Sequence, residues 1–167
     1  MKRLAIILMT ALVALVSCSK DDTNLEGRWN APRSDEQPDD TAIALIFSGN
    51  KLDLYICSYG WHFEGTYTYA DKTVKYNVTK AYSALTDVEI DERTGMIVAY
   101  SGGIESIDHN TLKPNAGYGW YDMLIYRPDL YEEYKDMLSS FTFEITGNGK
   151  AKSDVIGLMG STFTKVK

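Results

Sequence analysis

The chain has 167 residues, a net charge of −6 at pH 7, and 12 Tyr, 5 Phe and 3 Trp. This aromatic content argues against a disordered chain, and an acidic balance without basic runs argues against nucleic acid as a partner. The chain has only 2 His, too few for a three-histidine metal site. We therefore expect one small domain without a bound metal or cofactor.

Residues 1–17 have the features of a secretion signal. Lys2 and Arg3 form a short basic start, and residues 4–16 are uncharged and mostly apolar. This run is shorter than the roughly 20 residues that a membrane-spanning helix needs. We therefore expect the segment to be removed, which leaves a more acidic mature chain.

The end of the signal indicates how it is cleaved. An ordinary signal peptidase needs a small residue three positions before the cut, and cleavage before Cys18 would place Leu15 there. The stretch Leu15-Val16-Ser17-Cys18 resembles instead the lipobox of bacterial lipoproteins. The resemblance implies that Cys18 carries diacylglycerol and palmitate-type acyl chains, and several chains on one residue anchor a protein permanently. The alternative is an ordinary signal with an incidental cysteine.

Residues 18–24 are expected to be the lipidated cysteine and a polar tether, and residues 25–167 the folded domain. Ser19-Lys20-Asp21-Asp22 resembles the acidic export tag of surface lipoproteins in Bacteroidetes-type bacteria. The alternative is a plain solvated linker. Both interpretations place the protein in the cell outer membrane, but only the tag would place it on the outer face.

The pattern of the folded domain predicts many short strands with turns between them, and its period is two far more often than 3.6. Residues 30–41 are polar, contain Pro32 and Pro38, and predict a long loop. Residues 42–47 are apolar throughout, which predicts a strand covered on both faces. The strands expected in this half of the chain are 25–30, 42–47, 52–57, 61–69, 73–79 and a hairpin over 87–100.

The second half continues in the same way, with one exception. Residues 101–117 predict irregular structure, residues 118–126 an aromatic strand, and residues 128–140 the only helix. Two last strands are expected over 141–146 and 154–166. So many antiparallel hairpins leave unpaired edges unless the sheet closes, so we predict an all-β, antiparallel up-and-down barrel with one short helix before the last strands.

Gly27-Arg28-Trp29, followed by the long loop and a series of hairpins, resembles the lipocalins, and more closely the lipocalin-like domains of bacterial lipoproteins. In that family the tryptophan plugs the closed end of the barrel and the first loop lies at the open end. The resemblance implies that Gly27 and Trp29 form the plug and that residues 30–41 border the mouth. The stretch from Gly160 to Lys165 also resembles the last strand of the bacterial proteins.

Candidate catalytic residues are few, and we expect no enzyme. His62 is expected on a strand face and His109 in a surface loop, and neither stands in a triad pattern. With Cys18 lipidated, Cys57 has no disulfide partner, and its strand-like surroundings favour a buried hydrophobe over a nucleophile.

Acidic residues offer a third interpretation. Asp87, Glu89 and Asp91 alternate and are expected to share one strand face, where they could present carboxylates to Ca²⁺ or to a sugar bond in a hydrolase. A solvated strand face explains the same pattern, and the 12-residue calcium-loop motif is absent.

The density of aromatic residues is the main functional signal. The leading hypothesis is a non-enzymatic, monomeric, lipid-anchored protein that binds a small apolar or amphipathic ligand inside the barrel. Its expected pocket residues are Tyr67, Tyr69, Tyr76 and Trp120. The alternative is a surface module that binds a carbohydrate or a protein from outside through Tyr59, Trp61 and Tyr118.

Overall fold

The structure, a computed structural model, describes residues 24–34, 37–102, 106–157 and 161–167. The signal segment, Cys18 and most of the tether lie outside the described residues. Within the described part, no helix is both long and apolar enough to cross a membrane.

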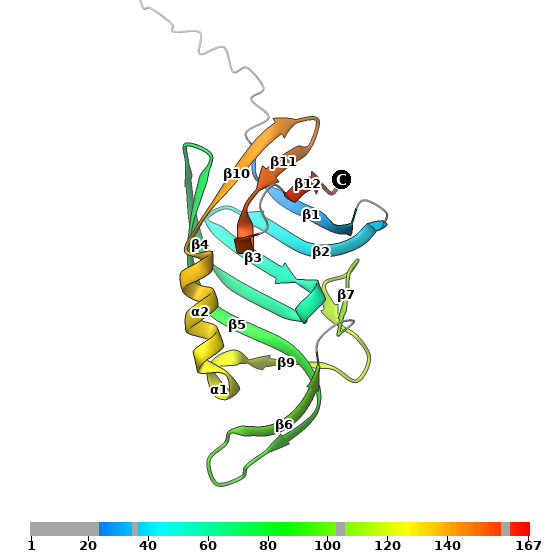
Figure 1. Cartoon of the computed structure of the whole chain (residues 1–167), viewed down its shortest axis with the longest axis vertical. Coiled ribbons are helices and arrows are strands. Elements are labelled where there is room, and N and C mark those ends of the chain that lie inside the picture. The colour runs from blue at the N-terminus through cyan, green and yellow to red at the C-terminus, as the bar shows by residue number, and fades with distance from the viewer. Residues whose placement is uncertain (1–23, 35–36, 103–105, 158–160) are drawn as a thin grey trace, which may run out of the picture.

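Eight antiparallel strands close into a barrel (Figure 1). When the eight strands are taken in chain order, each pairs with the next, and the last pairs with the first. This confirms the all-β antiparallel barrel predicted from the sequence. Its strands are β1 (Gly27–Ser34), β2 (Gln37–Ser48), β3 (Lys51–Ile56), β4 (Trp61–Ala70), β5 (Thr73–Ile90), β10 (Ser140–Gly147), β11 (Lys150–Ser153) and β12 (Ser161–Lys165).

A long insertion separates β5 from β10. It begins with a β-hairpin arm, in which the end of β5 pairs with β6 and which projects from the barrel in Figure 1. The helix predicted over 128–140 is confirmed as α2. The elements of the insertion are β6 (Ile97–Gly102), β7 (Ile107–Asp108), β8 (Lys113–Pro114), β9 (Gly119–Asp122), α1 (Met123–Tyr126) and α2 (Pro128–Leu138).

Helix α2 fills a gap in the barrel wall. Strand β10 pairs with β5 only over residues 73–75, and beyond that point α2 lies against β5. Pro128 at the first helical position and Asp129 in the first turn favour a helix start here. The helical spacing of Tyr131, Tyr134 and Leu138 then turns these three side chains toward the core. A short amphipathic helix thus replaces one strand pairing.

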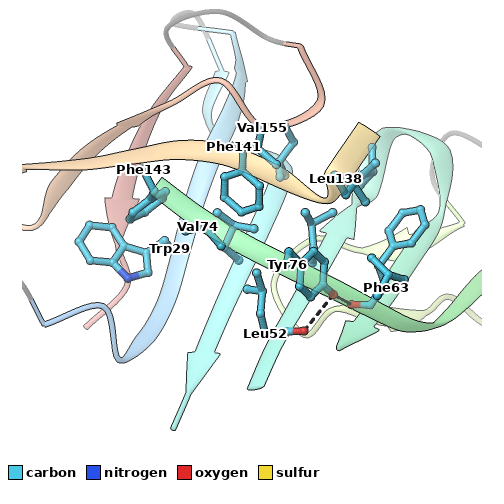
Figure 2. Close-up of a cluster of buried hydrophobic side chains, with 14 of the residues drawn as sticks. Trp29, Leu52, Phe63, Val74, Tyr76, Leu138, Phe141, Phe143 and Val155 are labelled. Carbon is cyan, nitrogen blue, oxygen red and sulfur yellow. Dashed lines mark hydrogen bonds between the residues drawn. The ribbon is translucent and has the colours of Figure 1, made fainter. Parts of the chain in front are cut away.

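Aromatic side chains fill the interior of the barrel (Figure 2). The ring of Trp29, 1% exposed, meets Phe143 edge-on at a centroid distance of 5.3 Å, and Phe143 also contacts Phe47 and Phe163. The indole Nε1 of Trp29 donates a hydrogen bond to the carbonyl of Leu25 at 2.7 Å. This end of the barrel is therefore packed with side chains.

Strand β2 is buried on both faces, as its apolar sequence predicted. Ile43, Leu45 and Phe47 point into the core, whereas Ala44 points outward and is also fully buried. The hairpin of β7 and β8 covers this outer face through Leu112. The guanidinium of Arg28 holds the hairpin in place by donating to the carbonyls of His109 and Asn110.

The prediction of a long loop over residues 30–41 is wrong. Strand β1 continues to Ser34, and β2 begins at Gln37, so most of this polar stretch is a paired hairpin. Register shifts flank Pro32, and such bulges accommodate a residue that lacks an N–H. Polar composition alone could not reveal the pairing, because it depends on Ile43 and Thr41 across the strands.

Two strand predictions near the end of the chain also need correction. The expected strand over residues 118–126 ends at Asp122, whose carboxylate accepts the N–H of Leu124 at 2.9 Å and caps α1. Of the expected strand over residues 154–166, only residues 161–165 form a strand, β12, because residues 155–157 form a short 3₁₀ turn, η2 (Val155–Gly157); β11, which precedes this turn, was not predicted.

Cys57 is buried, as the sequence predicted, but it lies in a turn and not in the expected strand. This residue opens a 3₁₀ turn, η1 (Cys57–Tyr59), and is fully buried against Ala44 and Leu112. Burial raises the pKa of the thiol to about 12, so the thiol stays protonated and unreactive at neutral pH.

Candidate ligand-binding site at the barrel mouth

The connections between the barrel strands fall into two groups. The tight turns after β2, β4 and β10 lie at one end, which is the end filled by Trp29 and Phe47. The β1–β2 hairpin, η1 and η2 lie at the opposite end, because alternate connections of an antiparallel barrel share an end. We call this second end the mouth.

A cavity of about 480 Å³ opens at the mouth. Its wall combines the end of β1 and the middle of β2 with η1, η2 and the last turns of α2, so five elements of the chain build it. Its lining residues are Arg33, Ala42, Ile43, Ser58, Tyr59, Tyr134, Met137 and Ile156.

Three aromatic rings form one side of the mouth. The 3₁₀ turn η1 ends at Gly60, whose left-handed backbone (φ 71°) lets the chain reverse and leaves Tyr59 52% exposed. The ring of Trp61 lies 4.9 Å from that of Tyr59 and 4.6 Å from that of Tyr134, measured between centroids. Trp61 thereby contacts both of the tyrosines that line the cavity.

Arg33 is the charged residue of the cavity wall. The Nε of Arg33 lies 3.1 Å from a carboxylate oxygen of Asp40, and His109 contacts the other oxygen of the same carboxylate. Asp40 therefore holds Arg33 at the edge of the cavity, next to walls formed by Ile43 and Met137. A few oriented polar groups beside an apolar wall are typical of small-molecule sites.

The structure brings the four predicted pocket residues together only in part: Tyr67 and Tyr76 are direct partners across β4 and β5 and line one hollow, but none of the four lines the cavity at the mouth. Tyr67 and Tyr69 line a shallower hollow near the turn after β2, away from the mouth. Tyr76 is 4% exposed, and its hydroxyl shares its one proton between the carbonyls of Leu52 and Phe63, both at 3.0 Å. Figure 2 shows these two bonds, which make Tyr76 part of the core.

Trp120, the fourth of these residues, lies on β9 outside the barrel. Its ring faces those of Tyr55 and His62, which point outward from β3 and β4. Of the three aromatic residues proposed for a surface module, Tyr59 and Trp61 are neighbours at the mouth, and Tyr118 precedes β9.

The acidic residues singled out from the sequence do not form a site either. Asp87 has a positive φ of 51°, and the pairing of β5 with β6 shifts between Thr86 and Glu89, so the alternation with Glu89 and Asp91 is interrupted. Within the described residues, the one group of His, Cys, Asp or Glu close enough for a metal ion is Asp53, His62 and Glu64.

Sequence reasoning missed Arg33, Met137 and Ile156 as site residues. Met137 lay in the predicted helix, but the pattern of one helix does not tell which part of the barrel it covers. Comparison of the chain with protein-family models, with curated proteins and with solved structures finds no match.

Proposed function

We propose that this protein is a non-enzymatic lipoprotein of the cell envelope that binds a small apolar or amphipathic ligand at the mouth of its barrel. The observation that carries the proposal is the cavity of about 480 Å³ between η1, η2, α2 and β2. Its size lies within the range of about 300–1,000 Å³ that is common for small-molecule sites.

The mouth is a more suitable binding site for the ligand than the barrel interior. Trp29, Phe47 and Phe143 occupy the opposite end and leave that part of the interior to side chains. A ligand would therefore lie beside Tyr59 and Tyr134 and rest on Ile43.

The lining favours a molecule with an apolar body and a polar end. Ile43, Met137 and Ile156 would contact the body, and each buried methylene contributes about 0.8 kcal/mol. The guanidinium of Arg33 and the hydroxyl of Ser58 can bind the polar end.

Substitution of Met137 by glutamate is expected to weaken ligand binding at least about tenfold, because a ligand would bury the new carboxylate at a cost of a few kcal/mol. Met137 is 40% exposed, so the variant should fold. The measurement is titration of the purified mature protein with a fluorescent fatty-acid analogue.

Met96→Glu is the matched control, because Met96 is 50% exposed at the tip of the β5–β6 arm, outside the cavity lining. It should bind the probe as the unchanged protein does. Equal affinities of the two variants would refute a site at the mouth.

A second candidate function is supported by the exposure of Tyr59. Its ring is 52% exposed and packs on Trp61, as in a platform that stacks on a sugar or on a partner protein. Tyr59→Ala would then abolish binding to an oligosaccharide array, while Met137→Glu would leave it intact. Loss of binding in Met137→Glu as well would favour the cavity, which both residues line.

We further propose that a lipid on Cys18 holds the domain at the outer membrane, on the basis of the lipobox-like stretch that precedes it. Cys18→Ser is expected to move the protein from the membrane fraction to the soluble fraction, since several acyl chains are lost at once. Fractionation of the native host with an immunoblot measures this. Retention of the variant in the membrane would contradict the proposal, and Cys57→Ser is the control.

A further inference from the structure

The outer face of the β3–β4 hairpin gathers two carboxylates and an imidazole. Asp53 and Glu64 are direct partners across the two strands, and His62 lies two residues before Glu64 on the same face. One possible ligand atom from each of the three lies within 4.8 Å of the other two. The register of β3 against β4 therefore fixes the positions of these three side chains.

The imidazole of His62 is held in one orientation. The side chain is buried, and its ring stacks on Tyr55 with a centroid distance of 4.0 Å and an interplanar angle of 4°. Tyr82 and Trp120 contact the ring at 5.8 and 5.5 Å. The Nε2 atom lies 3.2 Å from Oδ1 of Asp53, so it points toward the carboxylates.

The charge around this cluster is negative. The two carboxylates have one ammonium group nearby, that of Lys80, whose Nζ lies 3.6 Å from a carboxylate oxygen of Glu64. The side chain of Lys80 is 60% exposed, and such an exposed ion pair contributes only about 0–1 kcal/mol to stability. A divalent metal ion can therefore displace Lys80 from Glu64.

The distance between two of the three candidate ligand atoms suits a small transition-metal ion. Ligand atoms on one tetrahedral Zn²⁺ lie roughly 3.3–3.5 Å apart. The 3.2 Å between Nε2 of His62 and Oδ1 of Asp53 is close to that value. An imidazole nitrogen favours Zn²⁺ over Ca²⁺ or Mg²⁺, which bind through oxygen.

We propose that Asp53, His62 and Glu64 bind one Zn²⁺ ion on the outside of the barrel, with water completing the coordination. The stacked tyrosines would keep the imidazole in place, as groups around metal ligands commonly do. The site lies on the opposite face of the sheet from the core residues Leu52, Leu54 and Phe63 and is independent of the proposed ligand at the mouth.

The test is calorimetric titration of the mature protein, stripped with a chelator and kept in detergent with its anchor, using Zn²⁺ alone. One ion per chain is expected. Glu64→Gln and Asp53→Asn should each weaken binding tenfold or more, since even groups that only support a ligand contribute about 10–100-fold. His62→Asn should abolish binding.

Two controls keep the result interpretable. His109→Asn removes the other histidine, which contacts Asp40, and should leave Zn²⁺ affinity unchanged. Because replacement of the buried His62 could unfold the protein, the part-exposed Glu64 decides the outcome, with circular dichroism as the check of folding. Unchanged affinity in folded Glu64→Gln and Asp53→Asn, or no saturable binding at all, overturns the proposal.

Discussion

Trp29→Ala is expected to lower the free energy of unfolding by about 3–5 kcal/mol, a large part of the roughly 5–15 kcal/mol that holds a domain folded. The indole is 1% exposed and packs edge-on against Phe143. Alanine would leave a cavity beside Phe143, and it would also remove the hydrogen bond to the carbonyl of the buried Leu25.

Urea unfolding followed by circular dichroism measures this effect without relying on tryptophan fluorescence. Trp29→Phe should be intermediate, because it keeps a ring in the core but loses the Nε1 donor. Tyr59→Ala is the control for losing an aromatic ring, and its cost should stay below about 1 kcal/mol at an exposed position. A Trp29→Ala midpoint equal to that of Tyr59→Ala would show that the ring cluster does not support the barrel.

Features that depend on local patterns could be predicted from the sequence. The alternation of Leu52, Leu54 and Ile56 placed these residues on one face, and all three are fully buried. The helical spacing near Tyr131 and Tyr134 predicted α2, and continuous apolar residues predicted the two-sided burial of β2. In each case the period of the pattern matches the geometry of one element.

The mouth cavity could not be predicted in this way. Arg33, Tyr59, Met137 and Ile156 come from four segments whose proximity depends on barrel closure and on α2 filling the gap beside β5. The polar composition of residues 30–41 even pointed to a loop, because a hairpin with bulges around Pro32 leaves little trace in composition.

The Asp53–His62–Glu64 cluster is an intermediate case. His62 and Glu64 could be placed on one strand face from the alternation, but Asp53 joins them only when the register of β3 against β4 is known. Because the short turn η1 connects these strands, their register depends on residues that are close in the sequence. Aromatic stacking on His62 then depends on Trp120, which follows much later in the chain.

Gly65→Ala should destabilise the protein by about 3 kcal/mol, because the added methyl group meets the backbone of the neighbouring strand. A Cβ at this position would lie 2.9 Å from the carbonyl carbon of Asn77, overlap its oxygen, and approach the Tyr76 ring to 2.8 Å. The ring crosses over Gly65 so that its hydroxyl reaches the carbonyls of Leu52 and Phe63. The strands would have to separate, and both hydrogen bonds would weaken.

Gly49→Ala separates this clash from the general effect of replacing a glycine. Gly49 has a positive φ of 60° in the turn after β2, with no atom within 4 Å of an added Cβ. Its replacement should cost only about 1–2 kcal/mol of left-handed backbone strain. Urea midpoints of the two variants give the comparison. The bulge at Gly65 leaves no room for a side chain under the Tyr76 ring. If Gly65→Ala lowered the urea midpoint no more than Gly49→Ala does, Tyr76 could not lie across β4 in the way its hydrogen bonds require.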